Sequence, residues 1–416
     1  MAKKTKKSID IEIKESKADI ISKLVLFASL GVALSLLVGA VFPALYAVSS
    51  SELSELSWHS SAVDPWETGA LAVPLITINA IIFGIGFLAY KKSETILKLI
   101  TKIQSFEVSK RVTIIAIIIL LSIYIASAAP ELAVQEQWND FENVQKTAEL
   151  WSLENTKRFD IHVRHFLLSL SITLFDNIRI IPFIASISLL VLTFFITKKI
   201  TNKRLPGIIS MIVLMQSNIF LTYDTTATYT NFWISFYLLS LYLVYKKWHF
   251  SALSFLVSIP TKTLIFVFFP MSLFFIFRAS ISRRQKMYTL ISYSILIGII
   301  LGVISILNVN LTFGQIDFFG KNFLPSFSSL ASQLRFDGFI AIFILPLIVG
   351  LFLVSKRGLL AADSISILIS GSIMVLPLLV TFTSMTNQPY RLIPLIVFFA
   401  IGTGMLFSKI KTNSEL

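Results

Sequence analysis

Long apolar runs alternate with short polar segments along most of the chain, and this pattern predicts transmembrane helices. A helix needs about 18–20 apolar residues to cross a hydrocarbon core of about 30 Å. The short pair 249–259 and 262–277 is expected to form a hairpin of half-helices. The fold class predicted is all-α, a polytopic transmembrane bundle of about twelve spans. These spans are expected at residues 20–48, 68–90, 112–129, 178–197, 205–222, 229–245, 249–259, 262–277, 286–308, 338–354, 364–385 and 389–408.

The composition excludes a soluble domain. Of the 416 residues, 55% are hydrophobic and 14% are charged, with a mean hydropathy of +0.79, whereas soluble domains carry about 25% charged residues. The chain has no cysteine, which excludes disulfides, thiolate metal sites, iron–sulfur clusters and a cysteine nucleophile. Its four histidines are too few for a haem-rich redox protein.

The net charge of +13 is explained by membrane topology rather than by nucleic-acid binding, because cytoplasmic loops of membrane proteins collect Lys and Arg. With the N-terminus in the cytoplasm, most of the 36 basic residues fall on the inner side. We therefore expect a multi-pass membrane protein with both termini cytoplasmic. The lack of a retention signal in residues 411–416 favours a prokaryotic plasma membrane. The expected parts of the chain are a basic tail (1–19), an N-terminal hairpin with a basic cytoplasmic segment (20–111), a transmembrane core (112–408) and a second tail (409–416).

The segment 130–165 is the most distinctive loop on the expected outer side, because apolar residues recur in it at helical spacing. These residues are Trp138, Phe141, Ala148 and Trp151. The pattern predicts an amphipathic helix that lies in the outer membrane interface, with its tryptophans at headgroup depth.

Asp140, within this loop, is the first candidate for chemistry. It follows a predicted span by about ten residues, so its carboxylate would lie at the outer membrane surface. A carboxylate placed there can take a proton from an attacking hydroxyl. The alternative interpretation is an ordinary acid of a solvated loop.

Lys262 and Arg391 lie at or near membrane depth in the predicted topology. Because an intramembrane charge is costly, each is expected to have a functional partner. The alternative is a side chain that snorkels to the interface. Two or three cations that converge on one outer cavity would bind a lipid phosphate, since Arg can contact two phosphate oxygens at once.

Two pairs spaced by three residues have two interpretations each. Asp176 and Arg179 either form an ion pair on one helical face, or Arg179 contacts a phosphate instead. His162 and His165 are either phosphate donors or two metal ligands. A third metal ligand is not evident, so a divalent cation stays open and no other cofactor is required.

The order of these features resembles the GT-C superfamily of polytopic glycosyltransferases, in particular the dolichyl-phosphate-mannose–protein mannosyltransferase and lipid A aminoarabinose transferase type. The resemblance covers about residues 112–408 and leaves the first hairpin outside. Each motif alone is weak, and their order carries the resemblance. The motifs are Asn139-Asp140-Phe141-Glu142, the approach Asp160-Ile-His-Val-Arg-His165, Arg179-Ile-Ile-Pro182, the basic turn 198–204, the outer segment 221–226, Ser258-Ile-Pro-Thr-Lys262 and Pro389-Tyr-Arg391.

The resemblance implies an enzyme that moves a sugar from a polyprenyl-phosphate carrier to an acceptor hydroxyl on a protein or a lipid at the outer membrane face. It implies carboxylates that act as the base or lie near it, namely Asp140, Glu142 and Asp224. It also implies side chains that bind the donor and its phosphate, namely His162, His165, Arg179, Lys262 and Arg391.

Two departures from the family pattern leave alternatives open. Phe141 separates Asp140 from Glu142, so either acid is the candidate base, and Val163 stands where the family has proline. The altered acidic pair also allows an inactive accessory subunit. Broken half-helices and intramembrane charges are compatible with a transporter or flippase, although the chain shows no two pseudo-symmetric halves.

Overall fold

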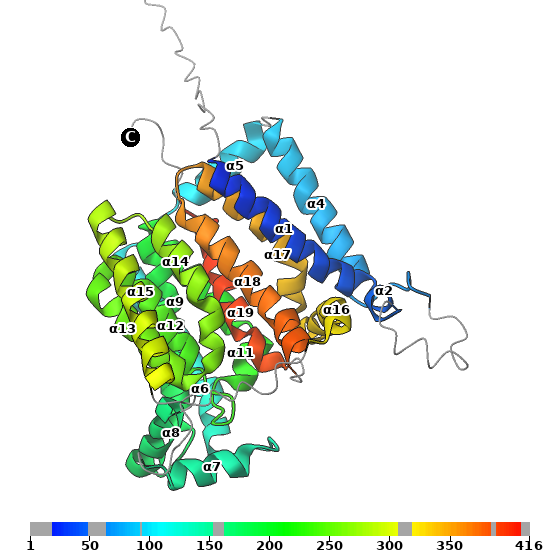
Figure 1. The fold of residues 1–416 in the computed structure, drawn as a ribbon. Helices are drawn as coiled ribbons and strands as arrows, with labels where there is room; N and C mark the ends of the chain where they lie inside the picture. Colours follow the sequence, from blue (N-terminus) through cyan, green and yellow to red (C-terminus); the bar gives the residue numbers. More distant parts are fainter. Residues whose placement is uncertain are drawn as a thin grey trace, which may run out of the picture.

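The computed structural model describes residues 19–48, 64–91, 94–152, 162–306, 318–383 and 388–408. The expected terminal tails, except residue 19, and Asp160 lie outside the described residues. All regular elements in the described ranges are helices, which confirms the all-α class (Figure 1). The first half contains α1 (Ile20–Val41), α2 (Pro43–Val48), α4 (Ala72–Tyr90), α5 (Glu94–Ser105), α6 (Lys110–Ala128), α7 (Phe141–Glu149), α8 (His162–Phe175), α9 (Ile180–Thr201), α10 (Arg204–Met215) and α11 (Asn218–Tyr223).

Short 3-10 segments interrupt the helical pattern, among them η1 (Ala129–Ala133) in the first half and η3 (Ile259–Thr261) and η7 (Pro389–Leu392) in the second. The helices of the second half are α12 (Phe232–Lys246), α13 (Ser251–Ser258), α14 (Phe269–Arg278), α15 (Arg283–Ile306), α16 (Phe323–Gln333), α17 (Gly338–Lys356), α18 (Ala361–Phe382) and α19 (Ile393–Met405).

Within the described ranges, six helical stretches are long and apolar enough to cross a membrane. These stretches are Ile20–Val41, Ala72–Ala89, Lys110–Ala133, Ile180–Thr201, Gly320–Lys356 and Ala361–Phe382. Four shorter apolar helices accompany them. The chain is therefore an integral multi-pass membrane protein, while the total of about twelve spans stays a prediction.

The helix α19 forms the centre of the bundle, where α9, α10, α17 and α18 pack around it. Its sequence is apolar on every side, which is typical of a helix that is buried all round. Gly404 allows the close approach of α10, because a Cβ at this position would collide with the carbonyl oxygen of Pro206 and with Ser210. Elsewhere, large apolar side chains of α4 and α6 point outward, as lipid-facing helices require.

The expected N-terminal hairpin does not pack as a unit apart from the core. The helix α1 lies against α16, α17 and α18, and α4 packs on α17. Sequence order therefore does not correspond to the packing order, because one side of the first helix packs against helices near the end of the chain.

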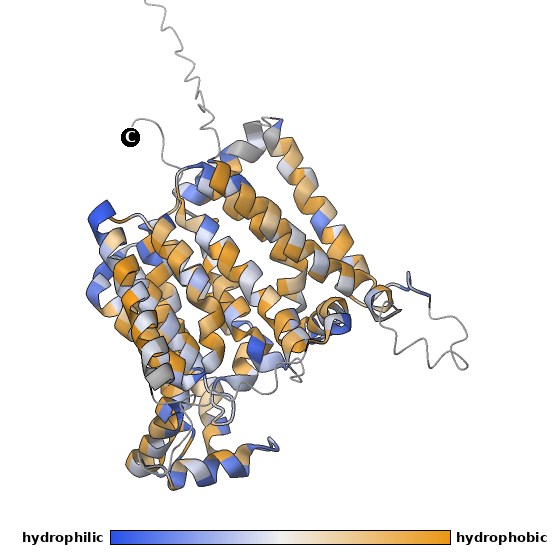
Figure 2. Cartoon of the chain, in the orientation of Figure 1, coloured by the Kyte–Doolittle hydropathy of each residue, from blue (hydrophilic) through white to orange (hydrophobic). Residues whose placement is uncertain are grey.

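Hydrophilic residues gather at the two ends of the bundle, whereas apolar residues dominate the long helices between them (Figure 2). One end carries α7, α8 and α11 and is drawn at the bottom of Figure 1; we call it the α7–α8 end. The other end, which carries α5, is called the opposite end. The candidate site residues lie at or near the α7–α8 end.

The amphipathic helix expected in the outer loop is present as α7, but its apolar side faces protein. Phe141 and Ala148 are buried in a cluster with Leu168 of α8. Trp138 and Trp151 lie just outside the helix. The apolar residues of α7 are therefore covered by α8, and the place of this helix in the outer membrane interface stays a prediction.

Candidate functional site

At the α7–α8 end, Arg179 joins two loops that are far apart in the sequence. Its guanidinium donates hydrogen bonds to the carbonyl oxygens of Thr225 (Nε, 3.0 Å), Val134 (Nη1, 2.5 Å) and Glu131, and to Thr225 Oγ1 (Nη2, 2.6 Å). It lies 3.8 Å from the carboxylate of Glu136. The ion partner of Arg179 is therefore Glu136 rather than Asp176, and its donors are engaged by the protein.

Two further charged side chains hold the loop 224–231. The buried carboxylate of Glu136 accepts hydrogen bonds from the backbone N–H of Ala227, from that of Thr228 (3.2 Å) and from Thr228 Oγ1 (2.8 Å). Arg164 of α8 donates through Nη2 to the carbonyl oxygens of Ala227 (3.1 Å) and Thr228 (2.5 Å). Charge-assisted bonds of this kind are the strong ones, so the two loops are fixed against each other.

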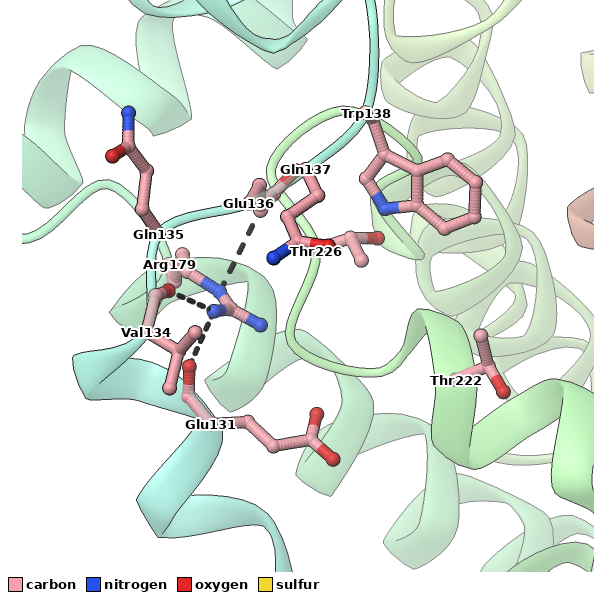
Figure 3. A pocket seen from close by; sticks show the side chains of 9 residues that line it. All are labelled: Glu131, Val134, Gln135, Glu136, Gln137, Trp138, Arg179, Thr222 and Thr226. Atoms are coloured by element: carbon pink, nitrogen blue, oxygen red, sulfur yellow. Dashed lines mark hydrogen bonds and ion pairs between the residues drawn. The ribbon is translucent and has the colours of Figure 1, made fainter.

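Between these loops lies a cleft of about 460 Å³ (Figure 3). The carboxylate of Glu131, the indole of Trp138 and Thr222 stand around its open space, with Gln137, Thr226 and Arg179 between them. Of the site residues expected from the sequence, Arg179 alone lines this cleft; the full lining is Glu131, Val134, Gln135, Glu136, Gln137, Trp138, Arg179, Thr222 and Thr226.

A row of aromatic rings leads from the cleft to a group of cations. Trp138 contacts Tyr229 edge-on, with ring centres 5.3 Å apart, and Tyr229 stacks on Tyr390 at 4.0 Å. The ammonium of Lys262 lies 4.3 Å from the centre of the Tyr390 ring. The guanidinium of Arg391 lies 5.6 Å from the same ring centre. The structure thus places Lys262 and Arg391 beside the same tyrosine ring.

Breaks in the helices place these two cations. Pro260 lies in η3, after which Lys262 leaves the helix in an extended conformation. Pro389 begins η7, which carries Arg391 and precedes α19. Proline at the start of a helical turn costs no hydrogen bond there. Proline also disfavours a helical conformation in the residue before it, as the extended Gln388 before Pro389 shows. Each break therefore presents a charged side chain at the end of an apolar segment.

Arg164 completes a group of three cations that we call the cation cluster (Arg164, Lys262 and Arg391). The charges of Arg164 and Arg391 lie close enough to act on the ammonium of Lys262. The Lys262 Nζ has no hydrogen-bond acceptor or carboxylate within reach among the described residues. Its observed contacts are the rings of Tyr390 and Trp233.

The expected carboxylates occupy different surroundings. Asp140 is exposed at the start of α7, where its charge acts on Arg164 and Tyr229. Glu142, two residues further, is also exposed. The charge of Asp140 therefore acts on the cation cluster, but neither Asp140 nor Glu142 lines the cleft.

Asp224 is buried, and among the described residues neither oxygen of its carboxyl has a hydrogen-bond partner. Burial raises the pKa of Asp224 to about 7, and the charge of Glu131 acts in the same direction. The nearby Tyr124 hydroxyl and Arg179 act in the opposite direction. The carboxyl is therefore partly protonated near neutral pH.

The two histidines lie on α8 beside the cation cluster. Burial lowers the pKa of His165 to about 4, and the charges of Arg164 and His162 add to this effect. His165 is therefore neutral at neutral pH and contributes no positive charge to a phosphate. Within the described ranges, no group of three histidine or carboxylate side chains is placed to hold a metal ion.

Comparison with protein-family models, with curated proteins and with solved structures found no match to the chain. The contacts, distances and charges of the site are therefore the basis for its proposed function. Glu131, Glu136 and Arg164 are the residues that the sequence did not single out. The signal that could have found Glu136 and Arg164 is a charge next to an apolar segment, which requires a partner.

Proposed function

We propose that the chain is a membrane glycosyltransferase of GT-C type, which moves a sugar from a polyprenyl-phosphate carrier to an acceptor hydroxyl on a protein or lipid at the α7–α8 end. The observation that carries this proposal is the cation cluster. Three positive charges repel one another, and an anion that binds among them relieves the repulsion. A phosphate fits this arrangement, because guanidinium groups contact two of its oxygens in parallel.

The depth of the cluster favours a phosphate that belongs to a lipid. Lys262 lies between the apolar helices α13 and α14, and Arg391 directly precedes the apolar α19. An anion bound there sits at the boundary between the hydrocarbon region and the polar end of the bundle. A phosphate with a long apolar chain satisfies both environments at once, whereas a free phosphate satisfies one.

In the proposed reaction, an acceptor hydroxyl attacks the anomeric carbon of the sugar. A new carbon–oxygen bond forms, and the bond between the anomeric carbon and the phosphate oxygen breaks with its electron pair on the leaving polyprenyl phosphate. The cation cluster stabilises the charge that develops on this phosphate, which is commonly the largest contribution to such catalysis. A carboxylate takes the hydroxyl proton.

The candidates for this base are Asp140, Glu142 and Asp224, to which the cleft adds Glu131. The charge of Asp140 acts on Arg164 of the cation cluster. Asp224 has a pKa of about 7, which suits proton transfer near neutral pH. We expect replacement of the true base by its amide to slow turnover by about 10²–10⁴-fold with little change in donor affinity.

The proposal is tested with the purified protein in phosphatidylcholine nanodiscs, incubated with a mixture of polyprenyl-phosphate sugars and a membrane extract as acceptor. Mass spectrometry follows each lipid. We expect one lipid-linked sugar to be consumed and polyprenyl phosphate to appear. Arg391→Lys keeps the charge but loses the planar fork, so the apparent donor affinity falls; Arg335→Lys, an exposed arginine outside the cluster, leaves it unchanged.

Consumption of none of the lipids by folded protein would contradict the proposal. Movement of an intact lipid between leaflets, without loss of its sugar, would instead support the transporter alternative.

A further inference from the structure

We propose that the cleft between the loops 131–138 and 222–226 is a carbohydrate-binding site. That this carbohydrate is the acceptor of the transfer reaction rests on the proposed function; the binding site itself does not. The charge of the cleft, its hydrogen-bonding groups, its aromatic wall and its connection to the cation cluster all favour a carbohydrate.

The cleft repels a phosphate. Its one guanidinium, that of Arg179, is balanced by the buried carboxylate of Glu136 and donates its hydrogen bonds to the protein. Glu131 then remains as a carboxylate without a balancing cation on the lining, so the cleft carries net negative charge. The phosphate of a donor therefore belongs at the cation cluster, and the cleft is left for another part of the reaction.

The hydrogen-bonding groups of the cleft are mainly acceptors. The Thr222 hydroxyl already donates to the Asn218 carbonyl oxygen at 2.8 Å. The Thr226 hydroxyl donates to the Tyr223 carbonyl oxygen at 3.2 Å. Each threonine therefore offers the cleft its lone pairs, and Glu131 is an acceptor when ionised.

The amide of Gln137 supplies donors beside these acceptors. A ligand that fits must offer several donors and some acceptors over a short distance. The hydroxyl groups of a sugar do both.

An aromatic wall adds an apolar surface of fixed orientation. The indole of Trp138 lines the cleft and is stacked on Tyr223, with ring centres 5.4 Å apart. Its contact with Tyr229 holds it from a second direction. The face of an aromatic ring is electron-rich, so it favours the C–H groups on the face of a sugar ring. Because the ring is held before a ligand arrives, little entropy is lost on binding.

Size and position agree with a sugar that meets a lipid-linked donor. The volume of about 460 Å³ lies within the usual range of small-molecule sites, about 300–1,000 Å³. The rings of Trp138, Tyr229 and Tyr390 connect the cleft to Lys262. Successive contacts of 5.3, 4.0 and 4.3 Å therefore join the cleft to the place where the donor phosphate is proposed to bind.

The test measures binding of methyl glucoside, methyl mannoside, methyl galactoside and maltose by saturation-transfer NMR. The protein is held in phosphatidylcholine nanodiscs, because a maltoside detergent would compete. We expect at least one saccharide to bind the wild-type protein, and Trp138→Ala to weaken it by about tenfold. Trp138→Phe keeps a ring and retains part of the binding, which separates the loss of a contact from misfolding.

Matched controls lie outside the cleft. Trp248→Ala removes an indole that does not line the cleft and is expected to leave binding unchanged. Glu131→Gln weakens binding, because it removes an ionic acceptor, whereas Glu149→Gln on the exposed side of α7 does not.

The inference is overturned if no saccharide binds, or if Trp138→Ala and Glu131→Gln both bind as the wild type does. It is also overturned if spermidine binds in place of the saccharides, since the cleft would then be a cation site. Failure of the proposed function is a different result: saccharides bind, but no lipid-linked sugar is consumed. If a lipid-linked sugar is consumed but no saccharide binds, the proposed function is supported and the carbohydrate-binding cleft is contradicted.

Discussion

Burial has opposite effects on two titratable side chains at the α7–α8 end, Asp224 and His165. It raises the pKa of Asp224 to about 7 and lowers that of His165 to about 4. The physical reason is the same in both, because a side chain removed from water disfavours its charged form. At neutral pH, Asp224 is therefore partly protonated and His165 is neutral.

We expect ionisation of Asp224 to lower the stability of the folded protein as the pH rises. Its pKa is raised from 3.8 to about 7 by folding, so the folded state binds the proton more tightly than the unfolded state. The stabilisation is present below pH about 4 and is lost as the pH rises through about 7. Its full size is on the order of 4 kcal/mol.

The measurement is thermal unfolding of the wild type and of Asp224→Asn at pH 5 and pH 8. Because other groups titrate in both proteins, the difference between them isolates Asp224. The amide variant should gain stability relative to the wild type at pH 8. An equal difference at both pH values would mean that Asp224 keeps an ordinary pKa.

The sequence identifies a single residue when placing its charge in an apolar segment costs so much free energy that a partner is required. Lys262 and Arg391 stood out because charges within apolar segments are expensive, and the structure places both beside one tyrosine ring. Glu136 and Arg164 did not stand out, because their roles depend on the loop 224–231. Glu136 and the Ala227 it binds are 91 residues apart, and no local pattern contains such a contact.

At the scale of elements, a buried ion pair fixes the first helix to the last ones. Arg278 at the end of α14 contacts Asp363 at the start of α18 and lies 2.6 Å from Asp19, which caps α1. Ser22 of α1 donates to the Asp363 carboxylate at 2.8 Å. One guanidinium thus ties three helices together at the opposite end.

We expect Asp363→Asn to destabilise the protein by about 3–5 kcal/mol, because it leaves the buried charge of Arg278 without its main partner. Thermal unfolding in nanodiscs measures this. Asp19→Asn is the matched control, since Asp19 lies at the water-exposed side of the same guanidinium, and its effect should be much smaller. Equal effects of the two substitutions would show that Asp363 is not the essential partner.

The helix α7 shows what periodicity can and cannot predict. Apolar residues at helical spacing correctly indicated a helix in the segment 130–165. The same spacing did not identify what covers the apolar side, because lipid and a neighbouring helix satisfy it equally. The structure supplies α8, which packs on Phe141 and Ala148.

At the scale of the whole molecule, the length of the apolar runs correctly predicted an all-α membrane protein, since long apolar runs form long helices whatever their neighbours are. It predicted the arrangement less well. The helix α1 lies among α16, α17 and α18, and this contact depends on residues more than three hundred positions away, such as the pair Ser22 and Asp363.

The orientation of the bundle is a prediction of the positive-inside rule. The chain has no cysteine, so single cysteines can be introduced without background. Leu150, beyond α7, and Leu99, in α5, are both exposed and lie at opposite ends of the bundle. In intact cells, an impermeant maleimide should label Leu150→Cys and leave Leu99→Cys unlabelled until the cells are opened. Labelling of Leu99→Cys alone would reverse the orientation.

The central claim is that the cation cluster binds a lipid phosphate, and a comparison of two ligands tests it most directly. Native mass spectrometry measures the affinity of the protein for a polyprenyl phosphate and for the polyprenol of the same length. We predict that the phosphate binds about 100-fold more tightly than the alcohol, since two charge-assisted hydrogen bonds are worth at least this much. Lys262→Gln should reduce this ratio, and Arg335→Gln, outside the cluster, should preserve it. Equal affinities for the phosphate and the alcohol in the wild-type protein would contradict the claim.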